Sequence, residues 1–285
     1  MAGGLQELRR RIRSAQNTQQ ITRAMKMVAG AKLRRAEERA RQSREFLSEI
    51  RAVAARAAAL GTRKSLLLEE RPVRRMGLVV ITSDRGLAGP YNANVLRHAV
   101  AAIRSQEAEV GVMVVGRKGR EFFRHRGYPI LEEFIGLGDE PSYRQARAIA
   151  DVVIAHFLDG NVDQVKLVYT RYINPMSQRP EVVDLLPVPR ANLEERGGGL
   201  KGYLFEPDPE EVLRDLLPRF IEVQLYGALL ESKASEHGAR MTAMDSASKN
   251  AEELIRRLIL LRNRLRQAAI TREIAELVGG AEALE

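Results

Sequence analysis

The sequence predicts an α/β domain inserted between two long helices, which pair as an antiparallel coiled coil. Three observations lead to this fold class. The C-terminal part has an extended heptad repeat, the N-terminal part has a weaker one, and strand and helix patterns alternate between them. A 3.5-residue repeat keeps one stripe of a helix facing a partner along its length. The predicted segments are 1–60, 72–190 and 208–285.

The C-terminal helix carries the clearest repeat. Its start is predicted at Asp208, because an aspartate N-cap, a proline at the first helical position and Glu211 at the third match a capping box. Pro218 predicts a kink or a restart, since proline removes a backbone donor. The helix beyond it spans about 90 Å. The seam is predicted at Leu216, Phe220, Val223, Gly227, Leu230, Ala234, His237, Met241, Met244, Ser248 and Ala251, then at Leu254, Leu258, Leu261, Leu265 and Ala268.

The N-terminal helix is predicted over residues 3–60, where proline is absent. Polar residues 16–20 interrupt its seam, and its length is about 85 Å. The similar lengths favour antiparallel pairing of the two helices within one chain. A parallel homodimer through each helix leaves that match unexplained. The seam positions are Leu5, Leu8, Ile12, Ala15, Ile21, Met25, Val28, Phe46, Ile50, Val53 and Ala57.

The middle of the chain alternates between buried-strand and helix patterns, which predicts an α/β sheet with parallel pairs. Apolar runs predict the strands, and longer amphipathic stretches predict the helices. The strands are predicted at 76–82, 110–115, 164–173 and 181–186, and the helices at 92–105, 117–126 and 142–158.

Charge and composition narrow the class of partner. The net charge is +9, and residues 1–60 contain 14 Lys/Arg against 5 Asp/Glu. Such a helix favours nucleic acid, anionic lipid or an acidic protein surface, although a solvated helix face explains it equally well. The absence of cysteine excludes disulfides, thiol catalysis and cysteine-ligated metal. No run of eighteen apolar residues is present, which argues against a membrane-spanning helix.

Signatures of catalysis are missing from the α/β domain. Neither the phosphate-loop pattern nor the dinucleotide-binding glycine pattern occurs. In the loop from Ser83 to Gly89, Gly86 and Gly89 with Arg85 are able to cradle an anion, but a tight strand-to-helix turn is the favoured interpretation. The four histidines lack metal-ligand spacing. We therefore predict no catalytic, metal or cofactor site.

Several motifs resemble the gamma subunit of F-type ATP synthases. They lie near the N-terminus, in the central loop, and in two parts of the C-terminal helix, so the resemblance extends from end to end. The matching stretches are residues 21–29 (ITRAMKMVA) with Lys32–Leu33, 83–92 (SDRGLAGPYN, with Pro90 where alanine is more usual), 234–244 (ASEHGARMTAM), and Ile270–Glu273 with Glu276 and Gly280–Ala281.

The resemblance implies a non-enzymatic rotor shaft with a Rossmann-like α/β domain and no cofactor. One copy per complex would turn inside a hexamer of three alpha and three beta subunits, beside epsilon and on the c-ring. It would couple proton-driven rotation to ATP synthesis or hydrolysis in the beta subunits. Its place would be the cytoplasmic face of the bacterial plasma membrane, as a peripheral protein. No nucleic-acid partner is expected.

The resemblance also assigns contact residues. The contacts with the acidic catch loops of beta fall on Met25, Arg240, Arg266, Gln267, Thr271 and Glu273. Arg34 and Arg35 are added from charge alone. The contact with the c-ring and epsilon falls on Tyr203, Leu204, Phe205 and Glu206.

Two alternatives come from other classes of protein. The first is a basic coiled-coil protein that binds nucleic acid, although the basic helix has only one aromatic residue, Phe46, for stacking. It predicts binding with a steep salt dependence. The second is an enzyme that uses the Ser83–Gly89 loop for a phosphate-bearing ligand, which predicts nucleotide binding that depends on Arg85.

Overall fold

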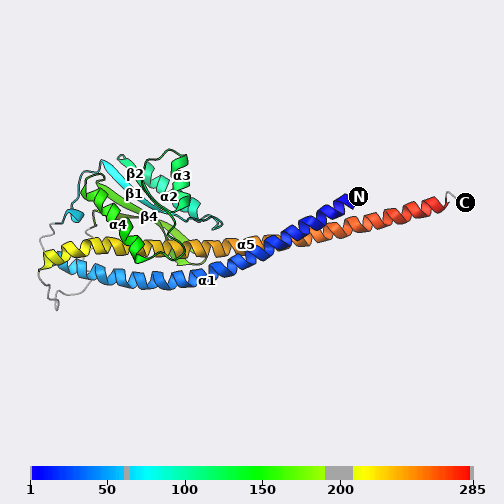
Figure 1. Ribbon diagram of the computed structural model, residues 1–285, viewed down its shortest axis with the longest axis horizontal. Helices are drawn as coiled ribbons and strands as arrows, with labels where there is room; N and C mark the ends of the chain where they lie inside the picture. The colour runs from blue at the N-terminus through cyan, green and yellow to red at the C-terminus, as the bar shows by residue number, and fades with distance from the viewer. Residues whose placement is uncertain (1, 61–64, 190–207, 283–285) are drawn as a thin grey trace. The chain divides into compact units, whose positions relative to one another are not determined.

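The computed structural model describes residues 2–60, 65–189 and 208–282. Two long helices, α1 (Ala2–Leu60) and α5 (Pro209–Glu282), precede and follow a five-stranded sheet (Figure 1). The chain divides into two compact units: residues 1–28 with 241–285, and residues 29–240. This division passes through both helices, so the three predicted segments remain a prediction.

The sheet has the strand order β3-β2-β1-β4-β5. The neighbours β1–β2, β2–β3 and β1–β4 are parallel, whereas β4 and β5 form an antiparallel pair. Four strands agree with the predicted ones to within a few residues, and β3 was not predicted because two glutamates interrupt its apolar pattern. The strands are β1 (Arg75–Ile81), β2 (Glu109–Val115), β3 (Ile130–Phe134), β4 (Gln164–Asn174) and β5 (Ser177–Leu186).

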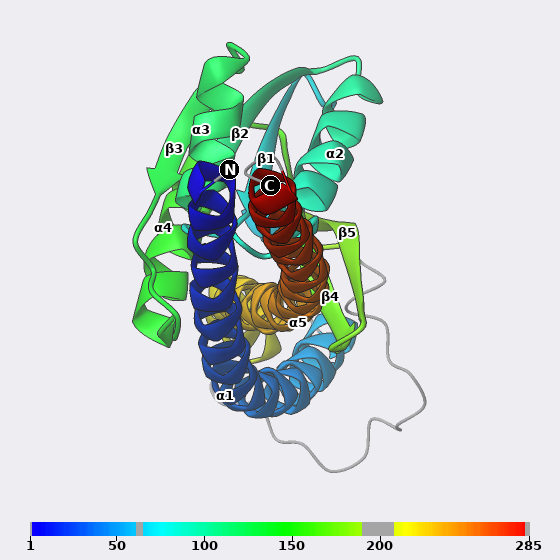
Figure 2. The same cartoon turned by 90° about the vertical axis from the view of Figure 1, so that its right-hand side faces the viewer.

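Helices cover both faces of the sheet (Figure 2). On one face, α2 and α3 pack over β1 and β2 through residues such as Val95 and Phe123. On the other face, α4 packs together with parts of α1 and α5 through residues such as Ile149, Ala54 and Phe220. The helices, all near their predicted positions, are α2 (Tyr91–Arg104), α3 (Arg117–His125) and α4 (Tyr143–Leu158), and a short 3-10 helix, η1 (Leu66–Leu68), precedes the sheet.

Within residues 29–240, α1 and α5 run antiparallel to each other. Arg44 forms an ion pair with Glu231 at 2.7 Å, and Gly227 lies so close to α1 that an added Cβ would meet the Ser43 hydroxyl oxygen at 3.3 Å. Nearly every residue of α5 between 220 and 239 is buried, since the helix packs against α1 on one side and the sheet domain on the other. A heptad seam accounts for only one of these two faces.

Within the other unit, the two helices also run antiparallel. Leu8 and Ile12 pack on Leu258, and Lys26 forms an ion pair with Asp245 at 2.6 Å. The predicted seam is correct through Ala251 in that its residues are buried or half-buried, but its continuation is wrong. Of the continuation, Leu258 is buried, whereas the others are exposed: Leu254, Leu261, Leu265 and Ala268. The first error is one of phase, because the buried residue that follows Ala251 is Ile255, four positions on, and not Leu254, three positions on.

The prediction of a restart at Pro218 is wrong, because α5 is continuous through this residue. Proline removes one helical hydrogen bond, but Leu217, Phe220 and Ile221 on either side of it are fully buried in the core. This burial keeps the segment helical. The predicted N-cap is confirmed: the Asp208 carboxylate accepts hydrogen bonds from the backbone N–H groups of Glu210 and Glu211 at 2.8 and 2.9 Å.

Candidate functional site

The carboxyl edge of the sheet is where open α/β domains bind ligands, at the point where the strand order reverses. Here that point lies between β1 and β4. It is filled by α5: Ser235 donates a hydrogen bond to the carbonyl oxygen of Thr170 at 3.2 Å, and the backbone N–H of Thr170 donates to the Ser232 hydroxyl at 3.4 Å. The cavity left there, lined also by Tyr91 and Glu236, measures about 10 Å³. That volume holds at most about one water molecule.

The loop from Ser83 to Asn92 connects β1 to α2 and is held by its own polar side chains. The Ser83 hydroxyl donates to the carbonyl oxygen of Arg85 at 2.6 Å, and the Asn92 amide donates to the Ser83 oxygen at 2.8 Å. The Asp84 carboxylate accepts from the backbone N–H groups of Arg117 and Gly136 at 3.0 and 3.3 Å. The first backbone N–H of α3 is therefore already bonded to a side chain of this loop.

Backbone geometry supports the turn interpretation of this loop. Gly89 has a φ of 53°, in the left-handed region that glycine reaches without steric cost. Leu87 also has a positive φ, 61°, which is unusual for a residue with a branched side chain. Gly86 does not have a positive φ; instead its carbonyl oxygen accepts a hydrogen bond from Arg240 at 3.2 Å. The loop is a docking element for α5.

Arg240 belongs to a buried charge cluster on α5. Its guanidinium contacts the Glu236 carboxylate at 2.7 Å, and Lys233 contacts the other oxygen of Glu236 at 2.9 Å. The side chains of Arg240 and Lys233 are each 12% exposed, and that of Glu236 is 4% exposed. Arg240 therefore has partners within the chain, and its assignment as a beta contact remains a prediction.

Tyr91 and His237 border the same cluster. Tyr91 is fully enclosed with Ala88 and Ala239, and burial together with the charge of Glu236 raises the pKa of its phenol. Burial also lowers the pKa of His237. Around its ring, Glu236 and Asp139 act to raise that pKa, whereas Arg240 and Lys233 act to lower it.

We expect His237 to make the stability of the chain depend on pH in one direction. Its folded-state pKa lies below its ordinary value of 6.5, so the unfolded state takes up the proton first as the pH falls. The stability from the neutral ring is complete above about pH 6.5 and is lost as the pH falls toward the lower folded pKa. Unfolding free energies from about pH 7.5 to about pH 5.5 should fall less steeply in His237→Gln than in the parent chain.

His98→Gln is the matched control for this measurement, because the ring of His98 is exposed and contacts only the carbonyl oxygen of Asn94 at 2.9 Å among the described residues. Its pH dependence should equal that of the parent chain. If the unfolding free energy falls equally steeply with pH in the His237 variant and in the parent chain, the buried ring is not the source of the pH dependence.

The other predicted beta contacts lie on two parts of the helices. Met25 is half-buried on α1, next to Lys26, which bonds Asp245. Arg266, Gln267 and Thr271 are exposed near the end of α5, and the Thr271 hydroxyl donates to the carbonyl oxygen of Gln267 at 3.0 Å. Glu273 lies in the same helix, but its side chain is outside the described part. From Asp245 to Arg266 the helix rises about 32 Å, so Met25 does not lie beside Arg266.

Apolar side chains surround the exposed polar ones at the end of α5. They are between about two fifths and three fifths exposed, which is unusual for large aliphatic residues repeated along one helix. Among the described residues, no second helix covers them. The set consists of Leu260, Leu261, Leu265, Ile270 and Ile274.

Asp245 shows how the paired part of the helices uses charge. Its carboxylate accepts from Lys249 at 2.8 Å and from Lys26 at 2.6 Å. These two lysines, Lys249 first, lower the pKa of Asp245 to about 2. Arg23 adds a looser ion pair with Glu252 at 3.5 Å. These ion pairs between α1 and α5 are exposed, so they add little stability. Their main effect is to fix which residues of the two helices lie opposite each other.

Arg34 and Arg35 are exposed on α1 within residues 29–240. Arg35 lies 3.6 Å from Glu140, which also accepts from Arg39 at 2.8 Å, so part of the charge of this helix face is already matched inside the chain. The predicted c-ring and epsilon contact, residues 203–206, lies outside the described residues.

A group of polar contacts that join the helices to the sheet domain does not follow from the sequence pattern. Tyr172 on β4 hydrogen-bonds Glu37 on α1, and its backbone oxygen accepts from Arg44 at 3.0 Å. Lys32 contacts Asp139 at 2.7 Å. A possible signal was the polar residues of the C-terminal helix that flank the apolar seam. Glu222, Glu231, Ser232, Ser235 and Glu236 are all buried.

The described part of the chain contains neither a metal-ligand cluster nor a helix that fits a bilayer. No group of His, Asp and Glu in it is arranged to hold a metal ion. None of its helices combines the length and apolarity needed to cross a bilayer.

Comparison with known proteins identifies the family. The family model described as ATP synthase matches residues 4–284. ATP synthase gamma chains from Desulforamulus reducens and Pelotomaculum thermopropionicum are 50% and 49% identical to the chain; the first match covers 98% and the second 99% of both partners.

Solved structures agree with the sequence matches. The chain is similar to a chain of the central stalk and c-ring of the Tetrahymena thermophila mitochondrial ATP synthase, with 28% identity, a TM-score of 0.59, and coverage of 80% of this chain and 99% of that one. A chain of the Euglena gracilis enzyme, at 19% identity, a TM-score of 0.72 and coverage of 100% of this chain and 95% of that one, supports the fold alone. The matched model and the relatives cover nearly the whole chain, and the chain therefore belongs to the ATP synthase gamma-chain family.

Proposed function

We propose that the chain is the central rotor shaft of a bacterial F-type ATP synthase. It is a non-catalytic subunit that couples proton-driven rotation of a c-ring to conformational change, and hence ATP synthesis or hydrolysis, in the beta subunits. One copy works with the alpha and beta hexamer, epsilon and the c-ring. The observation that carries this proposal is the end of α5, where exposed polar and aliphatic side chains alternate without a partner helix among the described residues.

The exposed end of α5 suits a shaft that turns inside a ring of similar subunits. Arg266, Gln267 and Thr271 offer polar contacts on one short stretch of helix. Each charge-assisted hydrogen bond is worth about 1.5–3 kcal/mol, enough to favour one beta conformation over another without holding the shaft in one orientation. We assign Glu273, Met25 and Arg240 to the same function, with Arg34 and Arg35 as further contacts.

A shaft also has to receive torque from the sheet domain. In residues 29–240, the contacts that join the domain to the two helices include Tyr172 with Glu37, Lys32 with Asp139, and Tyr143 with Glu222. Bonds on both α1 and α5 resist rotation of the domain about either helix. Residues 203–206 are our proposed contact with the c-ring and epsilon. The chain acts at the cytoplasmic face of the plasma membrane, as a peripheral subunit.

The relatives favour this function over a nucleic-acid-binding coiled coil, since they are named ATP synthase gamma chains. In this function, the positive charge of α1 binds an acidic protein surface. Co-purification from native membranes separates the two functions. Recovery of a hexameric ATPase with the tagged chain supports the rotor. Recovery of nucleic acid alone, released by salt, would contradict it.

We expect Arg266→Ala to lower coupled ATP synthesis in the assembled complex by about tenfold or more, because one charge-assisted hydrogen bond of about 1.5–3 kcal/mol is lost. The matched control is Arg264→Ala, which removes another exposed arginine, two residues away, that has no assigned contact. Turnover is measured together with proton pumping. Unchanged values for both variants would remove Arg266 from the contact set while leaving the rotor function standing.

A further inference from the structure

An open groove of about 890 Å³ lies between α2 and α3, on the face of the sheet domain that is opposite to α4 and α5 (Figure 2). Its apolar lining, Leu96, Val100 and Phe122, is buried or half-buried. Within residues 29–240, none of the described elements covers this groove. It combines a recessed apolar lining with a cationic border, which suits a partner that is both apolar and negatively charged. The arginines that line it are all exposed: Arg97, Arg104 and Arg126.

The outward side of α2 repeats at the spacing of a coiled-coil seam. Ala93, Arg97, Val100 and Arg104 follow one another at steps of four, three and four residues, and all of them line the groove. Such a stripe stays on one side of a helix and fits along a second helix. Arg97 and Arg104 are two turns apart, about 10 Å along the axis of α2. The spacing therefore favours a helix as the occupant of the groove.

The charge of this surface has one sign. α2 contains no aspartate or glutamate, and the single acidic residue of α3, Glu121, bonds Lys118 at 2.7 Å. None of the three groove arginines forms an ion pair with any residue that the structure describes. Arg126 lies over the ring of Phe122, 4.0 Å from its centre, which holds this cation beside the apolar lining. A positive potential over an apolar groove attracts a surface that carries carboxylates.

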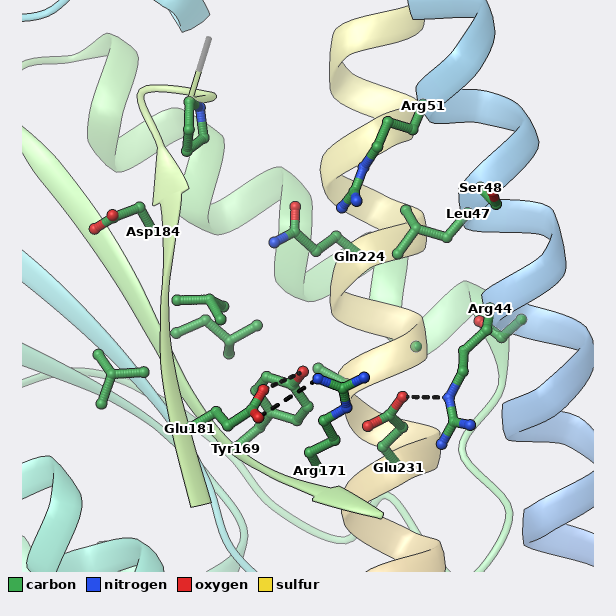
Figure 3. Close-up of a pocket in the computed structure, with 17 residues that line it drawn as sticks. Arg44, Leu47, Ser48, Arg51, Tyr169, Arg171, Glu181, Asp184, Gln224 and Glu231 are labelled. Carbon is green, nitrogen blue, oxygen red and sulfur yellow. Dashed lines mark hydrogen bonds and ion pairs between the residues drawn. The ribbon is translucent and has the colours of Figure 1, made fainter. Parts of the chain in front are cut away.

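A second hollow in the same unit, between α1, α5 and the β4–β5 hairpin, measures about 570 Å³ and differs in charge (Figure 3). Its lining holds three arginines and three carboxylates. Arg44 bonds Glu231 at 2.7 Å, and Arg171 lies 3.6 Å from Glu181, so these charges are matched within the chain. The α2–α3 groove has three arginines and no carboxylate in its lining. Of the two hollows, the groove between α2 and α3 is the one whose counter-charge has to come from another segment.

Three other occupants fit these observations less well. A bilayer binds apolar side chains that protrude from a surface, but none of the strongly exposed large apolar residues lies on α2 or α3. A second copy of this chain would place arginines opposite arginines. A nucleic acid would match the arginines through its phosphates, but Arg126 covers the ring of Phe122, which a base would need for stacking. A helix with acidic and apolar residues on one face satisfies both parts of the groove.

We propose that the α2–α3 groove docks an acidic amphipathic helix of a partner protein. Two carboxylates of that helix, two turns apart, pair with Arg97 and Arg104, and aliphatic side chains between them enter the groove at Val100 and Phe122. Arg126, directly after α3, supplies a third cation. The groove contains none of the residues assigned above to beta, epsilon or the c-ring, so this contact is additional to those of the rotor.

The probe is a synthetic helical peptide with glutamate at positions i and i+7 of one face and leucine at i+3 and i+4 between them. A side-chain bridge on the opposite face keeps it helical, which lowers the entropic cost of binding. Fluorescence anisotropy of the labelled peptide measures its binding to the full-length chain. We expect saturable binding with a dissociation constant of about 100 µM or lower. The peptide with glutamine in place of both glutamates should bind at least about tenfold more weakly, because two charge-assisted contacts are lost.

Charge-matched variants of the chain separate docking from general attraction to a basic protein. Arg97→Glu with Arg104→Glu should weaken peptide binding at least about tenfold. Arg144→Glu with Arg179→Glu changes the net charge equally at exposed arginines of α4 and β5, and should leave binding within about twofold of the parent chain. Ala101→Phe keeps the charge but fills the groove from an exposed position, so it should weaken binding at least about fivefold. All these positions are exposed, so unchanged thermal unfolding is the check on folding.

Several results would overturn the proposal. They are no peptide binding at concentrations up to about 1 mM, equal binding of the glutamate and glutamine peptides, or equal loss of binding in the two charge-reversed variants. Peptide binding that appears only after Glu194→Gln and Glu195→Gln would assign the groove to the chain's own residues 190–207 instead. Binding of the chain to phosphatidylglycerol vesicles that is lost in Arg97→Glu with Arg104→Glu would assign it to lipid. None of these results bears on the rotor function, which is measured by co-purification and coupling.

Discussion

Replacement of Glu236 by glutamine should lower the free energy of unfolding by about 3–5 kcal/mol, because it leaves two buried cations without a counter-charge. Lys233 and Arg240 both bond this carboxylate and are both nearly buried. The carboxylate then no longer offsets the repulsion between these two cations, which lie close together and largely away from water. Stabilities of about 5–15 kcal/mol are usual, so the loss is a large share of the total. Denaturant unfolding of the full chain measures it.

A triple variant shows whether the loss of stability comes from buried cations that have no counter-charge. Lys233→Met, Glu236→Leu and Arg240→Met together replace the charge cluster with apolar side chains of similar size. Such replacements are often neutral or stabilising, so most of the stability should return. If the triple variant is as unstable as Glu236→Gln, the unpaired charge of Lys233 and Arg240 is not the source of the loss.

Phe220→Ala should destabilise the chain by about 3–5 kcal/mol, the usual range for a buried phenylalanine. Phe220 is fully buried in the core where α5 meets α1, α4 and the sheet. Its removal costs both the transfer free energy of the ring and the cavity that remains, since neighbours on a helix and a sheet relax only partly. The expected sign is a lower denaturant midpoint with an unchanged slope.

Phe46→Ala is the control for ring size, because Phe46 is 56% exposed on α1. Its effect should stay within about 0.5 kcal/mol. Comparable losses in the two variants would mean that the ring of Phe220 does not have the packing described above. A loss confined to Phe220→Ala would place the junction of α5 with the sheet domain among the main sources of stability.

The motifs predict the candidate contact residues, and the structure adds contacts within the chain for one of them. Arg266, Gln267 and Thr271 are exposed, as a contact with another subunit requires. Arg240 is proposed for the same contact, and it is also bonded within the chain to Glu236 and to the Gly86 carbonyl oxygen. An arginine on a helix looks the same in the sequence whether its side chain faces a partner subunit or its own domain. Only the packing of the loop distinguishes the two cases.

Local pattern was sufficient for the long helices, for four of the five strands and for the antiparallel pairing, because a 3.5-residue repeat and apolar runs are properties of neighbouring residues. It failed where distant segments meet. The seam passes from Ala251 to the buried Ile255 and Leu258, and the exposed Leu254 is not part of it. Pro218 stays helical because its neighbours are buried. The contacts of Tyr172 with Glu37 and of Arg44 with Glu231 join residues more than a hundred positions apart. Such pairs depend on the folded arrangement of the helices against the sheet, which no local spacing encodes.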